Sequence, residues 1–311
     1  MNYTTTRRKF NTLCKSPKVI INKAWRLFEP IVSDRLFLKV SFRMKVGYWP
    51  DLDNPKTYNE KLQWLKLYNK HPEYSKMVDK IEAKKYVASI IGDEYIIPTL
   101  GTWNNVDEIN WDSLPNQFVI KVTNDSGGIV VCKDKTKLDI KKAKKILQYG
   151  WGRNYYRFNK EYPYKDVKPR IIAEQYMSDG DENGLRDYKF FCFKGTPKVM
   201  FLLKDRNIDT RLNFYDLEFN KLPFERGYPN FDDEVEKPKG WNEMITLAEK
   251  LSKDIAHIRV DFYNIKGKIY FGELTFFPGS GMERFKPKEW DTIMGDWIEL
   301  PPTKINRGDK I

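Results

Sequence analysis

The feature that most constrains the fold is a stretch near the C-terminus, IRVDFYNIKGKIYFGELTF, in which two alternating runs of apolar and polar residues flank a turn. Alternation with a period of two is typical of strands that bury one face, and a short turn containing glycine predicts an antiparallel hairpin. If residues 265–267 form a three-residue loop, Arg259 lies opposite Glu273 and Asp261 lies opposite Phe271.

One face of this hairpin is predicted to be polar, with Arg259, Asp261, Glu273 and Thr275 on it. The other face is apolar and consists of Ile258, Val260, Phe262, Tyr270, Leu274 and Phe276. Two carboxylates held close together repel unless a divalent cation or a shared proton lies between them, and oxygen ligands select Mg²⁺ or Mn²⁺ rather than zinc. The alternative is a surface strand pair in which Arg259 bridges the acids. The sequence PGSG, directly after the hairpin, suits a loop that closes on a ligand and favours the metal site.

A second candidate feature is Lys121, which lies inside the apolar run FVIKV and is followed by NDSGG. A lone ammonium among apolar residues is costly unless an anion accompanies it. A turn rich in Asn, Asp, Ser and Gly can direct backbone N–H groups at phosphate oxygens. The chain has no GxxxxGK[ST] or GxGxxG motif. The features therefore predict a phosphate site of another kind, although an edge-strand lysine beside a hairpin turn would look the same.

The remaining pattern predicts an α+β fold with antiparallel sheets. Thr57 and Glu60 have the spacing of a capping box, which predicts a helix starting near Thr57. Further helices are expected over residues 75–91, ending at Gly92, and over 138–148 and 241–255. Strands are expected over residues 117–123, 128–133, 170–177, 187–193 and 198–204, besides the final hairpin.

The net charge of +12 is concentrated at the N-terminus. Residues 1–50 hold eleven Lys or Arg against Glu29 and Asp34, which gives +9 and leaves +3 for the rest. Such a segment could meet nucleic acid, an acidic polysaccharide or an anionic membrane surface, or it could be a solvated face. No apolar run is long enough for a signal peptide or a membrane span, so we expect a cytoplasmic protein.

Cysteine and histidine are too scarce for several kinds of site. The three cysteines, Cys14, Cys132 and Cys192, are widely spaced and odd in number, which argues against a disulfide framework and a zinc site. With only His71 and His257 available, a histidine-based metal site or a Ser-His-Asp triad is not expected.

In their order along the chain, these elements resemble the ATP-grasp superfamily. The stretch RVDFYNIKGKIYFGELTFFPGSG is similar to the metal-binding hairpin of D-alanine:D-alanine ligase and its relatives. A closer resemblance is to the TupA-like ATP-grasp family of bacterial surface-polysaccharide gene clusters. It is carried by NPKTYNEKLQWLKLY, DKIEAKKYV, KPRIIAEQYM, DYKFFCF, TRLNFYDLEF and GELTFFPGSG, and runs from about Leu36 to Pro301.

This resemblance implies an ATP-grasp fold in which two antiparallel-sheet lobes clasp ATP. A basic, mostly helical segment would span residues 1–75. A lobe with the lysine and the glycine-rich phosphate loop would span 76–172. A lobe with the adenine hinge and the metal-binding hairpin would span 173–300, followed by a tail of residues 301–311.

The resemblance also implies roles for individual side chains. Lys80 and Lys121 would contact the ATP phosphates beneath a loop formed by Ser126, Gly127 and Gly128. The adenine would be received by the hinge residues Glu174, Gln175, Tyr176 and Met177, and the ribose hydroxyls by Asp187. Lys189, Lys204 and Arg206 are further candidates for contacts with phosphate.

At the metal end, the resemblance implies that Asp261 and Glu273 hold Mg²⁺ or Mn²⁺ and that Arg259 steadies charge on the reacting group. Arg211 would be a partner of the transferred phosphate. Thr275 stands where many ATP-grasp ligases have an asparagine ligand, and a hydroxyl is a poorer metal ligand than an amide oxygen.

The implied activity is ATP-dependent formation of an amide through an acyl phosphate. The carboxylate would belong to a uronic acid or amino acid of a capsular or cell-wall glycan, and the second substrate would be an amine. A sugar kinase or a glycosyltransferase of the same pathway is an alternative. A basic nucleic-acid-binding module leaves Lys121 and the hairpin carboxylates unexplained, so nucleic acid is not an expected partner. Residues 1–50 could also bring the enzyme to an acidic glycan or to the inner face of a membrane.

Overall fold

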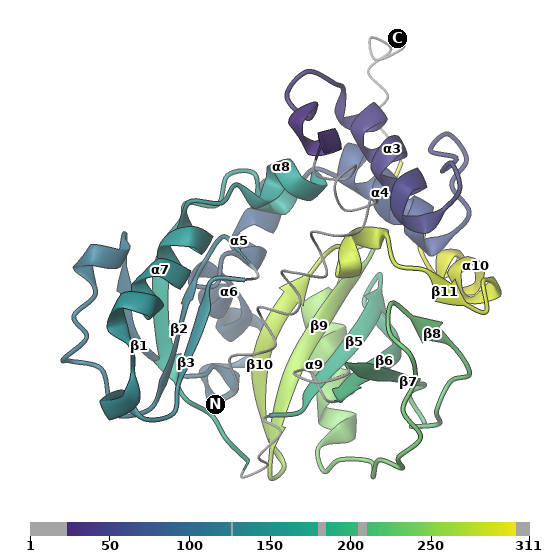
Figure 1. The fold of residues 1–311 in the computed structure, drawn as a ribbon. Helices are drawn as coiled ribbons and strands as arrows, with labels where there is room; N and C mark the ends of the chain where they lie inside the picture. Colours follow the sequence, from purple (N-terminus) through teal and green to yellow (C-terminus); the bar gives the residue numbers. More distant parts are fainter. Residues whose placement is uncertain (1–23, 126, 180–184, 205–209, 303–311) are drawn as a thin grey trace.

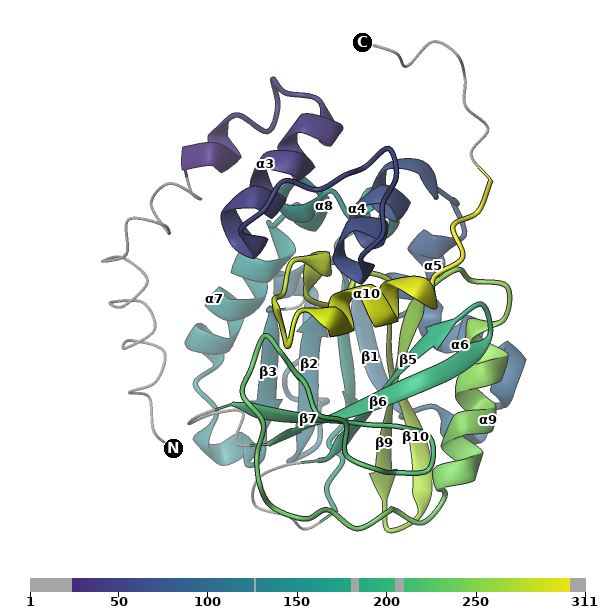
Figure 2. The same ribbon diagram turned by 90° about the vertical axis from the view of Figure 1, so that its right-hand side faces the viewer.

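A computed structural model describes residues 24–125, 127–179, 185–204 and 210–302. Two antiparallel sheets stand side by side, and a group of helices lies across one end of both (Figure 1). The expected α+β class is confirmed. The view turned by 90° in Figure 2 shows the same helical group at that end, above the strands.

The first sheet has four strands in the order β1-β4-β2-β3, and every neighbouring pair is antiparallel. The strands are β1 (Thr99–Trp103), β2 (Phe118–Val122), β3 (Ile129–Cys132) and β4 (Ile171–Gln175). Helix α7 (Ile140–Trp151) covers one face with Ala143 and Leu147. Asp139 starts this helix because its carboxylate accepts a hydrogen bond from Lys142 N at 3.0 Å.

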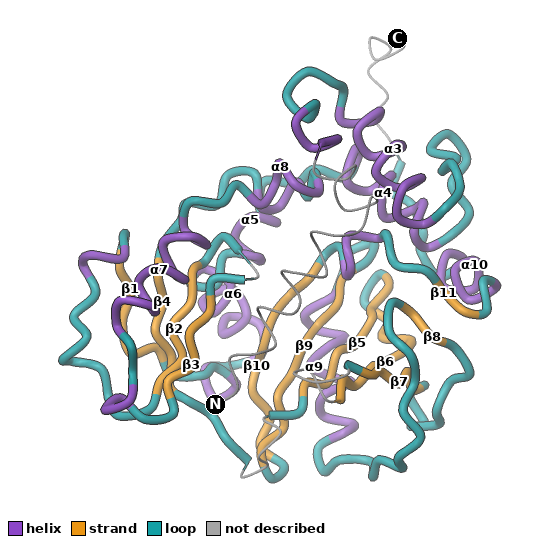
Figure 3. Tube along the Cα trace, in the orientation of Figure 1, coloured by secondary structure: helices purple, strands orange, loops and turns teal. Residues whose placement is uncertain are grey.

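The second sheet has five strands in the order β10-β9-β5-β6-β7, also antiparallel. They are β5 (Asp187–Phe193), β6 (Thr196–Lys204), β7 (Arg211–Tyr215), β9 (Ile258–Ile265) and β10 (Lys268–Thr275). All residues of β5 are buried, because both faces of the sheet are covered. Phe190 packs on Trp241 of α9 (Trp241–Ser252), while Phe191 packs on Tyr58 from the opposite side. Figure 3 shows the two sheets as separate blocks of strands.

The helical group contains α3 (Asp34–Val46), α4 (Tyr58–Tyr68) and α10 (Glu289–Asp296). The small pair of strands β8 (Glu225–Arg226) and β11 (Phe285–Lys286) lies next to it, and α8 (Tyr155–Asn159) leads towards the first sheet. The predicted capping box is present, since Thr57 Oγ1 accepts from Glu60 N and the Glu60 carboxylate accepts from Thr57 N. Helix α4 therefore begins as the sequence indicated.

The helix expected over residues 75–91 is instead two helices, α5 (Tyr74–Val78) and α6 (Glu82–Ile91). The break lies at Asp79, whose carboxylate accepts from Ile81 N at 2.8 Å and from Glu82 N at 3.3 Å. An aspartate that bonds backbone N–H groups in this way ends one helix and starts the next. The break places Lys80 between the two helices, and Gly92 ends the second as expected.

The two sheets divide the chain after β4, slightly beyond the expected boundary at residue 173. Helices α4, α5 and α6 share one hydrophobic core with the five-stranded sheet, and a separate core supports the four-stranded sheet. Tyr74 of α5, for example, packs on Phe276 at a ring-centroid distance of 4.3 Å. No helix within the described ranges has both the length and the apolar composition to cross a membrane.

Candidate active site between the two sheets

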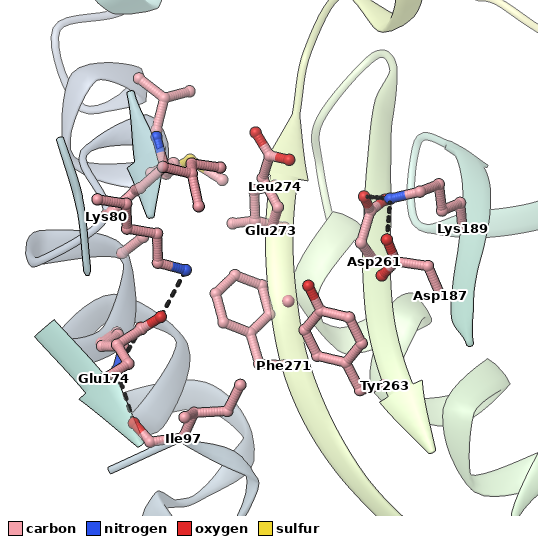
Figure 4. A pocket seen from close by; sticks show the side chains of 17 residues that line it. Lys80, Ile97, Glu174, Asp187, Lys189, Asp261, Tyr263, Phe271, Glu273 and Leu274 are labelled. Carbon is pink, nitrogen blue, oxygen red and sulfur yellow. Dashed lines mark hydrogen bonds and ion pairs between the residues drawn. The ribbon is translucent and has the colours of Figure 1, made fainter. Parts of the chain in front are cut away.

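A pocket lies between the two sheets and collects charged side chains from both sides (Figure 4). Its apolar wall includes Ile97, Ile129, Tyr263, Phe271 and Leu274. The side of α6 and the four-stranded sheet contributes Lys80, Lys84, Lys121 and Glu174, and the five-stranded sheet contributes Asp187, Lys189, Asp261 and Glu273. Cations and carboxylates that lie far apart in the sequence therefore meet in one place.

The final hairpin forms, but its register differs from the expected one. The turn has two residues, Lys266 and Gly267, with φ of 54° and 92°, so Ile265 rather than Asn264 pairs with Lys268. This geometry needs positive φ at both turn positions, and Asn264 supports it by accepting from Gly267 N at 2.9 Å. The expected three-residue loop was therefore wrong.

A bulge at Gly272 shifts the register again, so that Asp261 lies opposite Glu273 and Arg259 opposite Thr275. A Cβ on Gly272 would lie 3.1 Å from the Asp261 carbonyl oxygen, a tight contact that glycine avoids at the bulge. The bulge keeps the four predicted polar residues together on one face. On the turn side of the bulge, the two-residue turn pairs Tyr270 with Tyr263, so Tyr270 does not lie on the apolar face, where Ile269 is buried instead.

Asp261 is the centre of a buried ion-pair network. Arg259 binds it through two contacts, Nε to Oδ1 at 2.6 Å and Nη2 to Oδ2 at 2.7 Å. Lys189 forms an ion pair with Asp261 and another with Asp187 at 3.0 Å. Burial lowers the pKa of Arg259, but Asp261 outweighs burial and raises it above its ordinary value. The guanidinium is therefore permanently charged beside the polar face of the hairpin.

Glu273 is the open carboxylate of this group, with 43% of its side chain exposed and 3.8 Å between its Oε2 and Arg259 Nη2. The Thr275 hydroxyl accepts from Arg259 Nη2 at 3.0 Å. No cluster of three His, Cys, Asp or Glu that could hold a metal occurs in the described part of the chain. The pair Asp261 and Glu273 still fits a hard cation in its donor chemistry, provided that the remaining oxygens come from a bound ligand.

On the other side of the pocket, Glu174 bridges two lysines. Its carboxylate lies 2.6 Å from Lys84 Nζ and 2.5 Å from Lys121 Nζ, and only 6% of its side chain is exposed. Burial raises the pKa of Glu174, but Lys121 and Lys84 outweigh it and hold the pKa below its ordinary value. Burial also lowers the pKa of Lys84. The anion that Lys121 was expected to need is therefore supplied in this state by the protein.

Lys84 was not among the predicted site residues. Its ammonium also donates to the Ile97 carbonyl at 2.6 Å, which fixes it at the pocket wall. The signal that could have found it is its spacing of four from Lys80 in DKIEAKKYV, since residues four apart share one side of a helix. Lys80 lies just before α6 and donates to the Asp125 carbonyl at 2.7 Å, and burial lowers its pKa.

The sequence profile of the TupA-like ATP-grasp family matches residues 60–299. The chain belongs to this family. The match covers the pocket, both sheets and most of the helical group, and it confirms the resemblance drawn from the motifs together with the expected ATP-grasp fold. No curated protein matches the chain.

Solved structures with a similar fold include three ligases of low sequence identity. D-alanine–D-alanine ligase from Bacillus anthracis is 14% identical, with a TM-score of 0.39, and the match covers 66% of this chain and 58% of that one. The corresponding enzyme from Helicobacter pylori is 19% identical, with a TM-score of 0.34 and coverage of 72% and 63%. The ATP-grasp ligase PsnB, solved with a precursor variant, Mg and ADP, is 10% identical, with a TM-score of 0.42 and coverage of 76% and 63%. This chain thus spans less than two thirds of each of these proteins.

The expected phosphate loop of this ATP-grasp chain is only partly described, since Ser126 lies outside the described residues. A Cβ on Gly128 would lie 2.6 Å from Val122 Cγ2 and 3.2 Å from Gly150 Cα on α7. Gly128 is therefore needed for the loop to touch the helix. Gly127 and Gly128 are not among the described residues that line the pocket. Their contact with phosphate therefore stays a prediction.

The expected hinge contributes one side chain to the pocket. Of the described residues 174–177, only Glu174 lines it, while Gln175 is exposed and Tyr176 and Met177 are half-buried. A role for these residues in holding adenine through their backbone remains a prediction.

Two other predicted phosphate contacts lie away from the pocket. Arg211 begins β7, at the edge of the sheet farthest from β10, and donates to the Asn230 carbonyl at 3.2 Å. Lys204, at the end of the neighbouring strand β6, forms an ion pair with Asp233. Arg206 lies outside the described residues. In this state, the structure does not bring Arg211 or Lys204 to the site.

The PGSG loop after β10 adopts a conformation that needs its glycines. Gly279, Ser280 and Gly281 have φ of 56°, 57° and 57°, and a Cβ on Gly281 would lie 2.7 Å from Leu62 Cβ on α4. Three loop carbonyls accept hydrogen bonds from buried side chains: Pro278 O from Arg226, Ser280 O from Lys66 and Gly281 O from Gln63. The glycines thus serve packing against α4, and the loop is held firmly beside the end of the hairpin.

Proposed function

We propose that this protein is an ATP-dependent carboxylate–amine ligase that joins its substrates through an acyl phosphate. The observation that carries the proposal is the arrangement of charges in the pocket. Lys80, Lys84 and Lys121 line one wall, and Asp261 and Glu273 line the wall opposite, with Arg259 beside them. A polyanion with a divalent cation is the kind of ligand that both walls can bind at once.

The lysine wall is proposed to hold the phosphates of ATP. Lys84 and Lys121 would exchange part of their contact with Glu174 for contacts with phosphate oxygens. Lys80, which donates to the Asp125 carbonyl, would also donate to a phosphate oxygen. The apolar side chains Ile97, Ile129 and Leu274 line the same pocket and suit the flat faces of adenine.

Asp261 and Glu273 are proposed to hold Mg²⁺, or Mn²⁺ in its place. A divalent cation bound there would neutralise charge on the phosphoryl oxygens as the γ-phosphate is transferred. Glu273 is open to solvent, whereas Asp261 would have to share its oxygens with Lys189 and Arg259. Thr275 is proposed to position Arg259 through its hydroxyl rather than to bind the metal, because that hydroxyl already accepts from the guanidinium.

The reaction would proceed in two steps. A carboxylate oxygen of the first substrate attacks the γ-phosphorus, the bond to the bridging oxygen breaks, and ADP leaves. The nitrogen of an amine then attacks the acyl carbon, the carbon–oxygen bond to phosphate breaks, and the amine loses a proton to give the amide. Arg259 is held in place by two contacts with Asp261, so it can stabilise the oxyanion of the second step without reorganising.

We propose that the carboxylate belongs to a uronic acid or an amino acid of a bacterial capsular or cell-wall glycan. Membership of the TupA-like family supports this assignment, because the resemblance drawn from its motifs is to proteins of surface-polysaccharide gene clusters. The strongly basic residues 1–50 would favour an acidic acceptor.

The test is ADP release with candidate uronic and amino acids paired with amines, followed by mass spectrometry of the product. Glu273→Gln keeps the size of the side chain and removes a half-exposed carboxylate. We expect its kcat to fall about 100-fold, as for the loss of one transition-state contact, with an unchanged melting temperature. Asp233→Asn removes a carboxylate outside the pocket and is the matched control. Full turnover by Glu273→Gln would refute the metal assignment, and a phosphorylated sugar in place of an amide would refute the ligase.

A further inference from the structure

A group of large apolar side chains is exposed at the N-terminal end of the described chain. Leu27 and Ile31 are 79% and 77% exposed, Phe28 is 49% exposed, and Leu36 in the first turn of α3 is 47% exposed. Single exposed apolar side chains are common on soluble proteins, but four within ten residues of one segment call for a partner. We call Leu27, Phe28, Ile31 and Leu36 the N-terminal patch.

The turn that carries this patch is anchored to the fold. Trp25 stacks on Phe28 and on Phe37, with ring centroids 6.0 Å and 5.8 Å apart, and its indole N–H donates to Ser41 Oγ at 3.1 Å. Backbone bonds of 3.0 Å run from Phe28 N to the Trp25 carbonyl and from Ile31 N to the Phe28 carbonyl. The exposure of the patch is therefore a property of an ordered turn.

The acidic residues of this segment are turned towards the protein and neutralised there. Only 8% of the Glu29 side chain is exposed, and its carboxylate binds Arg157 at 2.8 Å and also Lys160. Asp34 lies 2.8 Å from Lys160 and accepts from the Tyr156 hydroxyl at 2.9 Å. These two are the only acids among residues 1–50, which hold eleven Lys or Arg. The described part of this segment, residues 24–50, holds five cations, Arg26, Arg35, Lys39, Arg43 and Lys45, so its net charge is positive.

We propose that the N-terminal patch docks on an anionic lipid bilayer. Its apolar side chains would enter the boundary between headgroups and acyl chains, and basic residues of the same segment would bind lipid phosphates. Charge complementarity selects this partner, because a segment of positive net charge that exposes aliphatic side chains matches an anionic headgroup layer above hydrocarbon. Nucleic acid or a free acidic glycan would use the cations but would leave the aliphatic side chains exposed to water. This inference does not depend on the chemistry proposed for the pocket.

The experiment is co-sedimentation of the full chain with phosphatidylcholine vesicles, with and without phosphatidylglycerol. We expect binding only to the anionic vesicles, and weaker binding at high ionic strength because salt screens the basic residues of this segment. The double variant Leu27→Ser, Ile31→Ser should bind the anionic vesicles at least about tenfold more weakly, with the same circular dichroism and ADP release. The matched control is Ile140→Ser, Tyr149→Ser on α7, where the parent side chains are 40% and 72% exposed, and we expect it to bind like the parent.

Two results would overturn the proposal. The first is that the parent does not bind anionic vesicles, or that the Leu27→Ser, Ile31→Ser variant binds them as strongly as the parent does. The other is a dimer in light scattering that becomes a monomer in this variant while no form binds vesicles. In that case a second copy of the chain covers the patch.

Discussion

Replacing Glu174 by glutamine tests the most unexpected feature of the pocket, a carboxylate shared by two lysines. Lys84 and Lys121 have 12% and 19% of their side chains exposed, so water compensates little for the loss of the anion. Glutamine keeps the shape of the side chain and removes only its charge. The variant therefore leaves two ammonium groups close together in a largely buried place.

Removing one partner of a buried ion pair costs about 3–5 kcal/mol. Because both ammonium groups retain some access to water, we expect the lower end, about 3 kcal/mol, which for a chain of 311 residues corresponds to a fall in melting temperature of roughly 5 °C. The matched control is Glu299→Gln, whose partner Lys194 is 63% exposed while Glu299 itself is 70% exposed. An exposed pair contributes roughly 0–1 kcal/mol, so this variant should melt within about 2 °C of the parent.

The pH dependence gives a second test of the same interaction. The folded protein holds the pKa of Glu174 below its ordinary value, so the unfolded chain binds the proton first as the pH falls. The stabilisation is complete above the unfolded-state pKa of about 4.3 and is lost as the pH falls through the folded pKa. The difference between parent and Glu174→Gln in urea unfolding should therefore be full at neutral pH and shrink in acid. A difference below about 1 kcal/mol at neutral pH, or one that grows in acid, would refute the reasoning.

Three further predictions concern packing and buried ionisable groups. Gly128→Ala should destabilise the protein by about 1–3 kcal/mol, because its Cβ would meet Val122 at 2.6 Å, whereas Gly152→Ala, with its nearest contact at 3.5 Å, should be close to neutral in thermal melts. Burial lowers the pKa of His257 to about 3, so the unfolded chain binds this proton first as the pH falls. The free energy of unfolding measured in urea should therefore fall by about 1.4 kcal/mol per pH unit as the pH falls below the unfolded-state pKa of about 6.5. This contribution to the pH dependence should vanish in His257→Asn. Lys66 and Glu161 are both buried. Burial lowers the pKa of Lys66 and raises that of Glu161, and the opposite charge of each residue counteracts this effect on the other. A double-mutant cycle of Lys66→Met and Glu161→Gln should therefore show a coupling of about 1–3 kcal/mol, and additive effects would contradict it.

The sequence was sufficient where a local rule decides the structure. The capping box at Thr57, the strand pattern of β2, β5 and β9, and the polar face of the hairpin each follow from spacings of a few residues. Strand β1 was not predicted. Its sequence, TLGTW, contains a glycine and lies at an edge of the sheet, where it buries little. Strand β7 was not predicted either, because RLNFY becomes a strand only by pairing with β6.

The register of the hairpin shows where local rules become insufficient. The sequence NIKGK allows either a two-residue or a three-residue turn. The choice of turn sets the register of the hairpin and therefore decides which residues pair across the two strands. The bulge at Gly272 then compensates, since it inserts one residue before Glu273. The polar face was predicted correctly because Arg259, Asp261, Glu273 and Thr275 alternate with apolar residues along their strands, but which acid lies opposite which group depends on the bulge.

Contacts between segments far apart in the sequence could not be predicted, because they depend on which strands pair and on how the helices pack against the sheets. Glu174 was expected to receive adenine, and nothing near it in the sequence shows that Lys84 and Lys121 reach its carboxylate. Arg211 was expected near the transferred phosphate, and only the strand order shows that β7 lies at the opposite edge from β10.

The ion pairs of the pocket explain how one cleft can hold both cations and carboxylates before a ligand binds. Lys84 and Lys121 share Glu174, while Lys189 and Arg259 share Asp261, so no ammonium or guanidinium among these four lacks a nearby carboxylate. ATP alone would bring negative charge towards Asp261 and Glu273, which would oppose binding. With ATP and a divalent cation both bound, the lysines would contact phosphate and the two hairpin acids would hold the cation, so each charge would keep a partner. The proposed function therefore requires that ATP binds much more weakly when divalent cations are chelated. It also requires that Glu273→Gln loses most of this dependence, and calorimetry with and without Mg²⁺ would show whether it does.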